Sequence, residues 1–184
     1  MVDDAGAPAL THVDESGAAR MVDVSAKDVT VREAKATGRV RVSAQVSALL
    51  RGPGVAKGDA LGVARIAGIM GAKRTADLIP LCHPLPLSSV SIELEVLDES
   101  VEITAVVRTN ARTGVEMEAL TAVCTAGLAL VDMVKAVDKA AVIDDVKVVR
   151  KSGGRTGTWQ REDAGTVGGG KRADDQRTGG GGQE

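Results

Sequence analysis

Regular alternation of apolar and polar residues predicts a β-hairpin in the middle of the chain. Apolar residues occupy every second position in residues 90–96 and again in residues 101–107, with an Asp-Glu-Ser turn between them. Such alternation is typical of strands with one face on a core and one in water. Valines near residues 29–42 and 142–149 predict two more strands, the first ending near Ser43, and residues 44–50 fit a short helix.

Two longer segments show the three- and four-residue spacing of helices. Residues 57–77 carry one apolar stripe of Val63, Ile66, Ala67 and Met70. Glycines in this segment lower its helix propensity by about 1 kcal/mol each, a cost that suits close approach of another backbone. The second helix follows Gly114 and needs a partner surface for its stripe. That stripe comprises Leu120, Val123, Cys124, Gly127, Leu128 and Val131.

The order of these segments predicts the fold class. Strand, helix, strand, strand, helix, strand is the split βαβ order of a ferredoxin-like α+β fold, with two long helices packed on an antiparallel sheet. We expect a flexible N-terminus over residues 1–9, one ferredoxin-like domain over residues 10–157, and a disordered tail over residues 158–184. The tail is rich in glycine and too poor in apolar residues to order itself.

Composition narrows the function classes. The 184 residues carry a net charge of −2, so the whole chain does not attract nucleic acid or an anionic membrane. Phe and Tyr are absent and Trp159 stands alone, which disfavours the aromatic stacking that single-stranded nucleic acid requires. We therefore expect neither a nucleic-acid partner nor a membrane partner.

The cysteines and the chain start favour a cytoplasmic protein. Cys82 and Cys124 are far apart and form no CxxC pair, which argues against a disulfide framework and a structural zinc site. The N-terminus lacks the pattern of a secretory signal, and no apolar run approaches the ~18 residues that span a bilayer.

His83 is a candidate functional residue on a stiff connector. Residues 78–85 read LIPLCHPL, which places Cys82 and His83 between two prolines. A metal site is disfavoured because His12 is the sole other imidazole in the sequence. Cys82 as a nucleophile is disfavoured because no base is evident by spacing. A structural histidine and a histidine that binds substrate both stay open.

A polar line runs along the second long helix beside its apolar stripe. Asp132 and Lys135 lie one turn apart and can pair, and partial burial would move the lysine toward proton transfer. A solvated helix face is the alternative. Glu118 lies 14 residues from Asp132, about 21 Å along the helix. If both act, they serve opposite ends of a long substrate or a site shared between subunits.

Basic residues at the ends and faces of the predicted elements allow a pocket for a phosphorylated ligand, although scattered solubilising cations explain them equally well. These residues are Lys27, Arg32, Lys57, Lys73, Arg74, Lys135 and Lys151.

Many separate segments, taken in order, resemble the MoaC family of molybdenum cofactor biosynthesis. The resemblance runs from about residue 10 to residue 157. It rests on MVDVSAK (21–27), TVREA (30–34), KGD (57–59), ARIAG (64–68), AKRT (72–75), DLIPLCHPL (77–85), TGVEMEALT (113–121), DM (132–133), KAV (135–137) and KSGG (151–154).

This resemblance implies a lyase, cyclic pyranopterin monophosphate synthase. It would convert the 3′,8-cyclised dihydro-GTP intermediate to cyclic pyranopterin monophosphate and release pyrophosphate. We expect no cofactor and no metal held by the protein, and the sequence leaves open whether a divalent ion accompanies the triphosphate. The family likeness also implies a homohexamer, a trimer of dimers with shared sites. By motif position, Asp132, Lys57 and Lys135 would be catalytic. The substrate pocket would be lined by Leu81, Cys82, His83, Met117 and Glu118. The alternative is a catalytically inert nucleotide-binding or regulatory ferredoxin-like oligomer, which turnover would distinguish.

Overall fold

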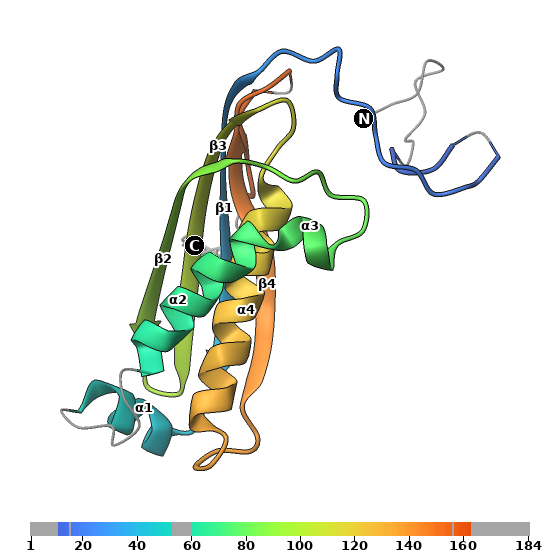
Figure 1. Cartoon of the computed structure of the whole chain (residues 1–184). Helices are drawn as coiled ribbons and strands as arrows, with labels where there is room; N and C mark the ends of the chain where they lie inside the picture. The colour runs from blue at the N-terminus through green and yellow to red at the C-terminus, as the bar shows by residue number, and fades with distance from the viewer. Residues whose placement is uncertain (1–10, 15, 53–59, 156, 163–184) are drawn as a thin grey trace, which may run out of the picture.

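A five-stranded antiparallel sheet forms one layer of the molecule, and helices cover one of its faces (Figure 1). The computed structural model describes residues 11–14, 16–52, 60–155 and 157–162. The strands are β1 (Thr30–Arg41), β2 (Leu87–Val96), β3 (Ser100–Ala111), β4 (Val142–Ser152) and β5 (Trp159–Gln160). The helices are α1 (Ala44–Arg51), α2 (Ala60–Lys73), α3 (Thr75–Leu78) and α4 (Glu116–Val134).

The strand order confirms the predicted ferredoxin-like α+β fold. The sheet runs β2-β3-β1-β4-β5, so β3 lies between β1 and β2 and is antiparallel to both. This is the split βαβ arrangement, with α2 and α4 as the two long helices. The helix predicted over residues 57–77 is α2 followed by the short α3; residues 57–59 lie outside the described part of the chain.

The core is built mostly from small side chains. Alanines and valines of β1, β3 and α4 fill it, and Ile103 and Leu130 are its largest fully buried side chains. Gly38, in the middle of β1, lies under α4: a Cβ atom there would come within 2.5 Å of a methyl carbon of Val123. The helix layer therefore sits close to the sheet.

Helix α2 turns its small residues inward and its large apolar residues outward. Ala60, Ala64, Gly68, Gly71 and Ala72 are buried, whereas the predicted stripe is exposed, with Ile66 61% accessible. A Cβ atom at Gly71 would overlap Thr125 of α4, so the predicted close approach is confirmed. Because small residues let α2 lie against α4, Val63, Ile66 and Met70 of the stripe stay exposed in the described part of the chain.

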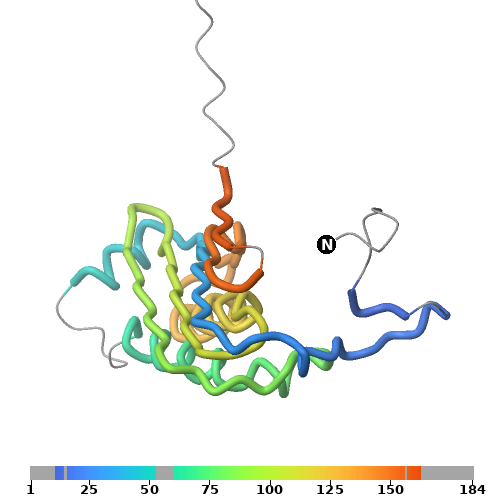
Figure 2. The backbone as a smooth tube through the Cα atoms, turned by 90° about the horizontal axis from the view of Figure 1, so that it is seen from above, coloured from blue at the N-terminus to red at the C-terminus, as the bar shows by residue number. Residues whose placement is uncertain are grey.

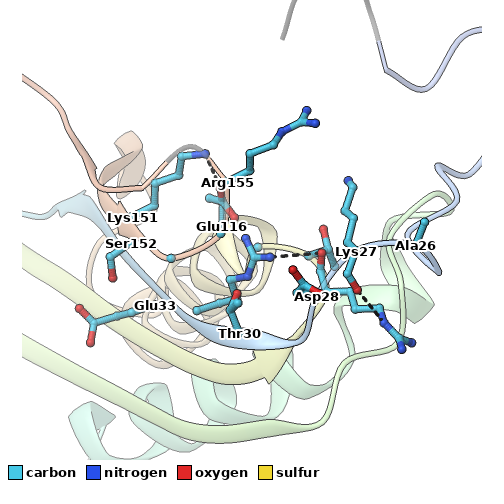
Figure 3. A pocket seen from close by; sticks show the side chains of 15 residues that line it. Ala26, Lys27, Asp28, Thr30, Glu33, Glu116, Lys151, Ser152 and Arg155 are labelled. Carbon is cyan, nitrogen blue, oxygen red and sulfur yellow. Dashed lines mark hydrogen bonds and ion pairs between the residues drawn. The ribbon is translucent and has the colours of Figure 1, made fainter.

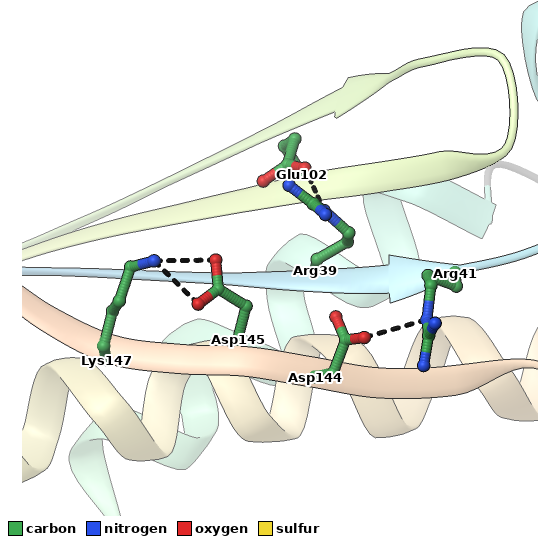
Figure 4. Close-up of polar contacts among 6 residues, drawn as sticks. All are labelled: Arg39, Arg41, Glu102, Asp144, Asp145 and Lys147. Carbon is green, nitrogen blue, oxygen red and sulfur yellow. Dashed lines mark hydrogen bonds and ion pairs between the residues drawn. The ribbon is translucent and has the colours of Figure 1, made fainter. Parts of the chain in front are cut away.

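The other face of the sheet carries ion pairs, two of them between neighbouring strands and one within β4 (Figure 4). The pairs are Arg39 with Glu102 at 2.5 Å, Arg41 with Asp144 at 2.8 Å and Lys147 with Asp145 at 2.7 Å. Asp145 has a φ of 53° and lies where the register between β1 and β4 shifts, as in a β-bulge. Exposed pairs of this kind add little stability each, but they make this face polar.

The described structure continues past the predicted domain end. Trp159 and Gln160 form β5 against β4, and the Arg161 guanidinium lies 5.5 Å from the Trp159 ring centroid. These residues pair with the edge of β4, which supplies backbone partners that composition does not reveal. Residues 1–10 and 163–184, which include the rest of the expected tail, lie outside the described residues.

Helix α4 corrects one further expectation from the sequence. Among the described residues it is the one helix long and apolar enough to cross a membrane, contrary to the prediction that no such run exists. Half of that stretch is buried inside the molecule, against the sheet and α2. It is therefore well explained as the core helix of the fold.

Candidate functional site

Two neighbouring cavities lie at the N-terminal end of α4. The smaller, about 230 Å³, is lined by the connector after α3, the first turn of α4 and the segment before β1. That N-terminal segment extends to one side of the body in both views (Figure 2). The larger cavity, about 640 Å³, shares Lys27, Thr113, Gly114 and Glu116 with the smaller one. The two cavities are therefore neighbours that share part of their lining.

The smaller cavity brings together all five residues predicted to line a substrate pocket. These are Leu81, Cys82, His83, Met117 and Glu118. His83 Nε2 lies 2.9 Å from the backbone carbonyl oxygen of Val22. Because a carbonyl can only accept, Nε2 donates, which fixes the ring against the N-terminal segment. His83 thus has a structural partner and also lines the cavity.

Glu118 is the electrostatically distinctive group of the smaller cavity. Glu118 is only 4% exposed. This burial raises the pKa of its carboxyl to about 7, and the negative charge of Glu116 adds a smaller increase. A carboxyl with this pKa can both donate and accept a proton near neutral pH. Burial and the nearby Glu118 also raise the pKa of the Cys82 thiol, which makes a thiolate nucleophile less favourable.

Asp132 and Lys135 lie near the opposite end of α4. Lys135 Nζ is 2.5 Å from Asp132 Oδ1, so the predicted pairing is present. Their side chains are 69% and 66% exposed, which is the solvated helix face that the sequence left open as the alternative. Glu118 and the Asp132–Lys135 pair do not meet within one chain, because the 14 residues between Glu118 and Asp132 span about 21 Å of helix. Lys57 lies outside the described residues.

Basic side chains dominate the charge of the larger cavity (Figure 3). Its cations are Lys27, Arg32, Arg112, Lys151 and Arg155. Three of them belong to the basic set noted in the sequence, whereas Lys73, Arg74 and Lys135 line neither cavity. Arg112 and Arg155 were missed, although each directly follows or precedes a segment of the family resemblance.

Comparison with known proteins identifies the family. The MoaC family model matches residues 21–154. A protein of Streptomyces coelicolor named cyclic pyranopterin monophosphate synthase is 70% identical over 152 residues, which cover 83% of this chain and 89% of that protein. A protein of Mycobacterium tuberculosis named cyclic pyranopterin monophosphate synthase 2 is 59% identical, covering 83% and 91%. The synthase of Thermomicrobium roseum is 56% identical, covering 84% and 94%. With the split βαβ fold and the assembled pocket, these matches show that the chain belongs to the MoaC family.

Proposed function

We propose that this protein converts the 3′,8-cyclised dihydro-GTP intermediate to cyclic pyranopterin monophosphate with release of pyrophosphate, in molybdenum cofactor biosynthesis. The observation that carries this proposal is the pair of neighbouring cavities, which share part of their lining. One holds a buried carboxyl beside His83 and Cys82, which suits the polar edge of a purine-derived ring. The other is lined by five basic side chains, which suits a polyphosphate.

The reaction needs proton transfer and charge stabilisation. Opening and reclosing the ring require general acids and bases, and we assign these roles to Asp132, Lys135 and Lys57. A substrate hydroxyl then forms a bond to the α-phosphorus while its proton passes to a base. The bond from that phosphorus to the bridging oxygen breaks, and pyrophosphate leaves with the electron pair. Cations where this charge accumulates lower the barrier.

A second copy of the chain supplies the missing half of each site in this proposal. Glu118 and Asp132 are equidistant from Thr125 along α4. A twofold axis near Thr125, with α4 and its partner antiparallel, would bring the partner's Asp132 level with Glu118. The outer helix face offers exposed apolar residues for such contact: Val63, Ile66, Met70 and Leu128. Three such dimers would form the proposed homohexamer.

An inert nucleotide-binding or regulatory oligomer is not favoured, since the similar proteins reported above are named as synthases. We place the enzyme in the cytoplasm, where reducing conditions suit Cys82 and Cys124, both free thiols. The substrate is a small molecule, and the proposal involves no nucleic-acid or membrane partner.

Turnover tests the reaction. Purified protein is incubated with the cyclised dihydro-GTP intermediate, and both pyrophosphate and the cyclic phosphate product are measured. Binding of the intermediate without pyrophosphate release would refute the enzyme proposal. Replacing Lys57 or Lys135 with Ala should abolish release without dissociating the oligomer, and retained activity would refute their assigned roles.

Complementation tests the shared site. Glu118→Gln and Lys135→Ala are each expected to be inactive alone. When the two variants are unfolded together and refolded as mixed oligomers, about a quarter of the sites regain both native residues if each site draws on two subunits. Lack of recovery in mixed oligomers would place the whole site within one subunit. Refolding each variant separately provides the control.

A further inference from the structure

Three acidic residues line the larger cavity, and one of them, Glu116, forms an ion pair with a cation of the same lining. Lys151 Nζ lies 3.2 Å from Glu116 Oε1, and their side chains are 33% and 30% exposed. Figure 3 shows Lys151 reaching from β4 to Glu116 at the start of α4, with Arg155 beside them. Glu116 also lines the smaller cavity, so this ion pair stands where the two cavities join.

The other acidic residues of the larger cavity are placed differently. Glu33 is already neutralised: its two carboxylate oxygens accept hydrogen bonds from Arg108 at 2.5 Å and from Arg150 at 2.8 Å. In Figure 3 it points away from Lys151 and Glu116. Asp28 is exposed to solvent. Glu116 is therefore the carboxylate that an entering anion would meet at Lys151.

A neighbouring arginine is held in a fixed position by the turn after β4. The Arg32 guanidinium donates to the carbonyl oxygens of Ala111 and Arg112, each at 3.4 Å. It rests on Gly154, which has a φ of +73°, and a Cβ atom at Gly154 would overlap the guanidinium. This glycine is thus needed both for its backbone conformation and for the space that Arg32 fills.

A hydroxyl donor in the same cavity lacks an acceptor. The Thr30 Oγ1 atom is buried and has no hydrogen-bond partner among the described residues. Thr30 lines the larger cavity with Arg32 and Lys151. Buried polar atoms are normally satisfied, so this hydroxyl is an exception in the described part of the chain.

We propose that the larger cavity is the subsite for the pyrophosphate part of the substrate, and that Glu116 is its internal counter-ion. When the subsite is empty, Glu116 pairs with Lys151. When pyrophosphate enters, its oxygens replace the carboxylate at Lys151; as it leaves, Glu116 returns. Glu116 thereby weakens product binding and favours release. This inference rests on the proposed function for the identity of the ligand.

Direct binding of inorganic pyrophosphate to the full-length oligomer tests the inference by calorimetry. Removing the competing charge with Glu116→Gln should tighten binding about 10-fold, because an ion pair no longer has to break and a repulsive charge is gone. Lys151→Gln should weaken binding about 10-fold. Glu102→Gln, which alters an ion pair on the opposite sheet face, should leave the affinity unchanged.

If Glu116→Gln binds pyrophosphate as tightly as the unaltered protein, or more weakly, the counter-ion role is overturned. It is also overturned if neither protein binds pyrophosphate detectably. Gly154→Ala provides a second route, since displacing Arg32 should weaken binding several-fold even if Glu116→Gln fails to fold. Unchanged affinity in Gly154→Ala, with the oligomer intact, would also count against the subsite.

Turnover separates this inference from the function on which it rests. If the unaltered protein releases pyrophosphate but Glu116→Gln shows no tighter binding, the inference fails and the proposed function stands. If the expected affinity changes occur but no turnover is found, the anion subsite stands and the proposed reaction fails.

Discussion

The buried carboxyl of Glu118 should make the stability of this protein fall as the pH rises through neutrality. Burial raises its pKa to about 7 from an ordinary value of 4.5. Between these two values the folded chain binds a proton that the unfolded chain has lost, so the free energy of unfolding decreases with increasing pH. At 1.36 kcal/mol per pKa unit, the loss between pH 5 and pH 8 is about 2 to 3 kcal/mol.

Replacing Glu118 with Gln removes the titrating group and keeps its shape. We expect the free energy of unfolding of Glu118→Gln to fall less than that of the unaltered protein between pH 5 and pH 8, by about 2 to 3 kcal/mol. Denaturant unfolding at fixed protein concentration measures this difference, and other titrating groups cancel because both proteins contain them. Parallel loss of stability in the two proteins would show that Glu118 is already ionised at pH 5.

Two further predictions concern the faces of α2. Gly71→Val should lower the free energy of unfolding by about 1–3 kcal/mol, because the new side chain overlaps Thr125, whereas the exposed Lys73→Ala should change it by less than about 0.5 kcal/mol. Denaturant unfolding distinguishes them, and equal effects would contradict the close helix contact. Ile66→Glu should keep the subunit folded but reduce the molar mass found by light scattering, because it places a charge on the exposed stripe. An unchanged mass would remove this stripe from the proposed interface.

The sequence predicted the strands well because alternation records burial on one face of a sheet. The hairpin of β2 and β3 is an example, because its alternating residues face one another across the two strands: Val90 faces Val107, and Val96 faces Val101. The orientation of α2 was less accessible, since both its faces are apolar and periodicity cannot tell which faces the core. β5 escaped prediction because its partner is the backbone edge of β4, distant from any local pattern.

The site was likewise predictable where local motifs define it and unpredictable where distant segments meet. Motif likeness placed Cys82, His83 and Glu118 in one pocket, and the fold does bring them together. It did not reveal Arg112 and Arg155, which come from separate strand ends and meet only through the fold. Nor could spacing along α4 show that Lys135 is exposed, because spacing does not tell which polar side chains of a helix lie against other elements.

The tight seam between α2 and α4 has a mechanical consequence. Helix α4 carries Glu116 and Glu118 in its first turn and Asp132 near its last, so in the proposed shared site it would be a rigid spacer between the two groups of residues. Gly71 and the small residues beside it set the distance between α2 and α4. One added methyl group in the seam would therefore shift both ends of the spacer at once. In a symmetric assembly, that single change would misalign every site, although it touches none of the reacting groups.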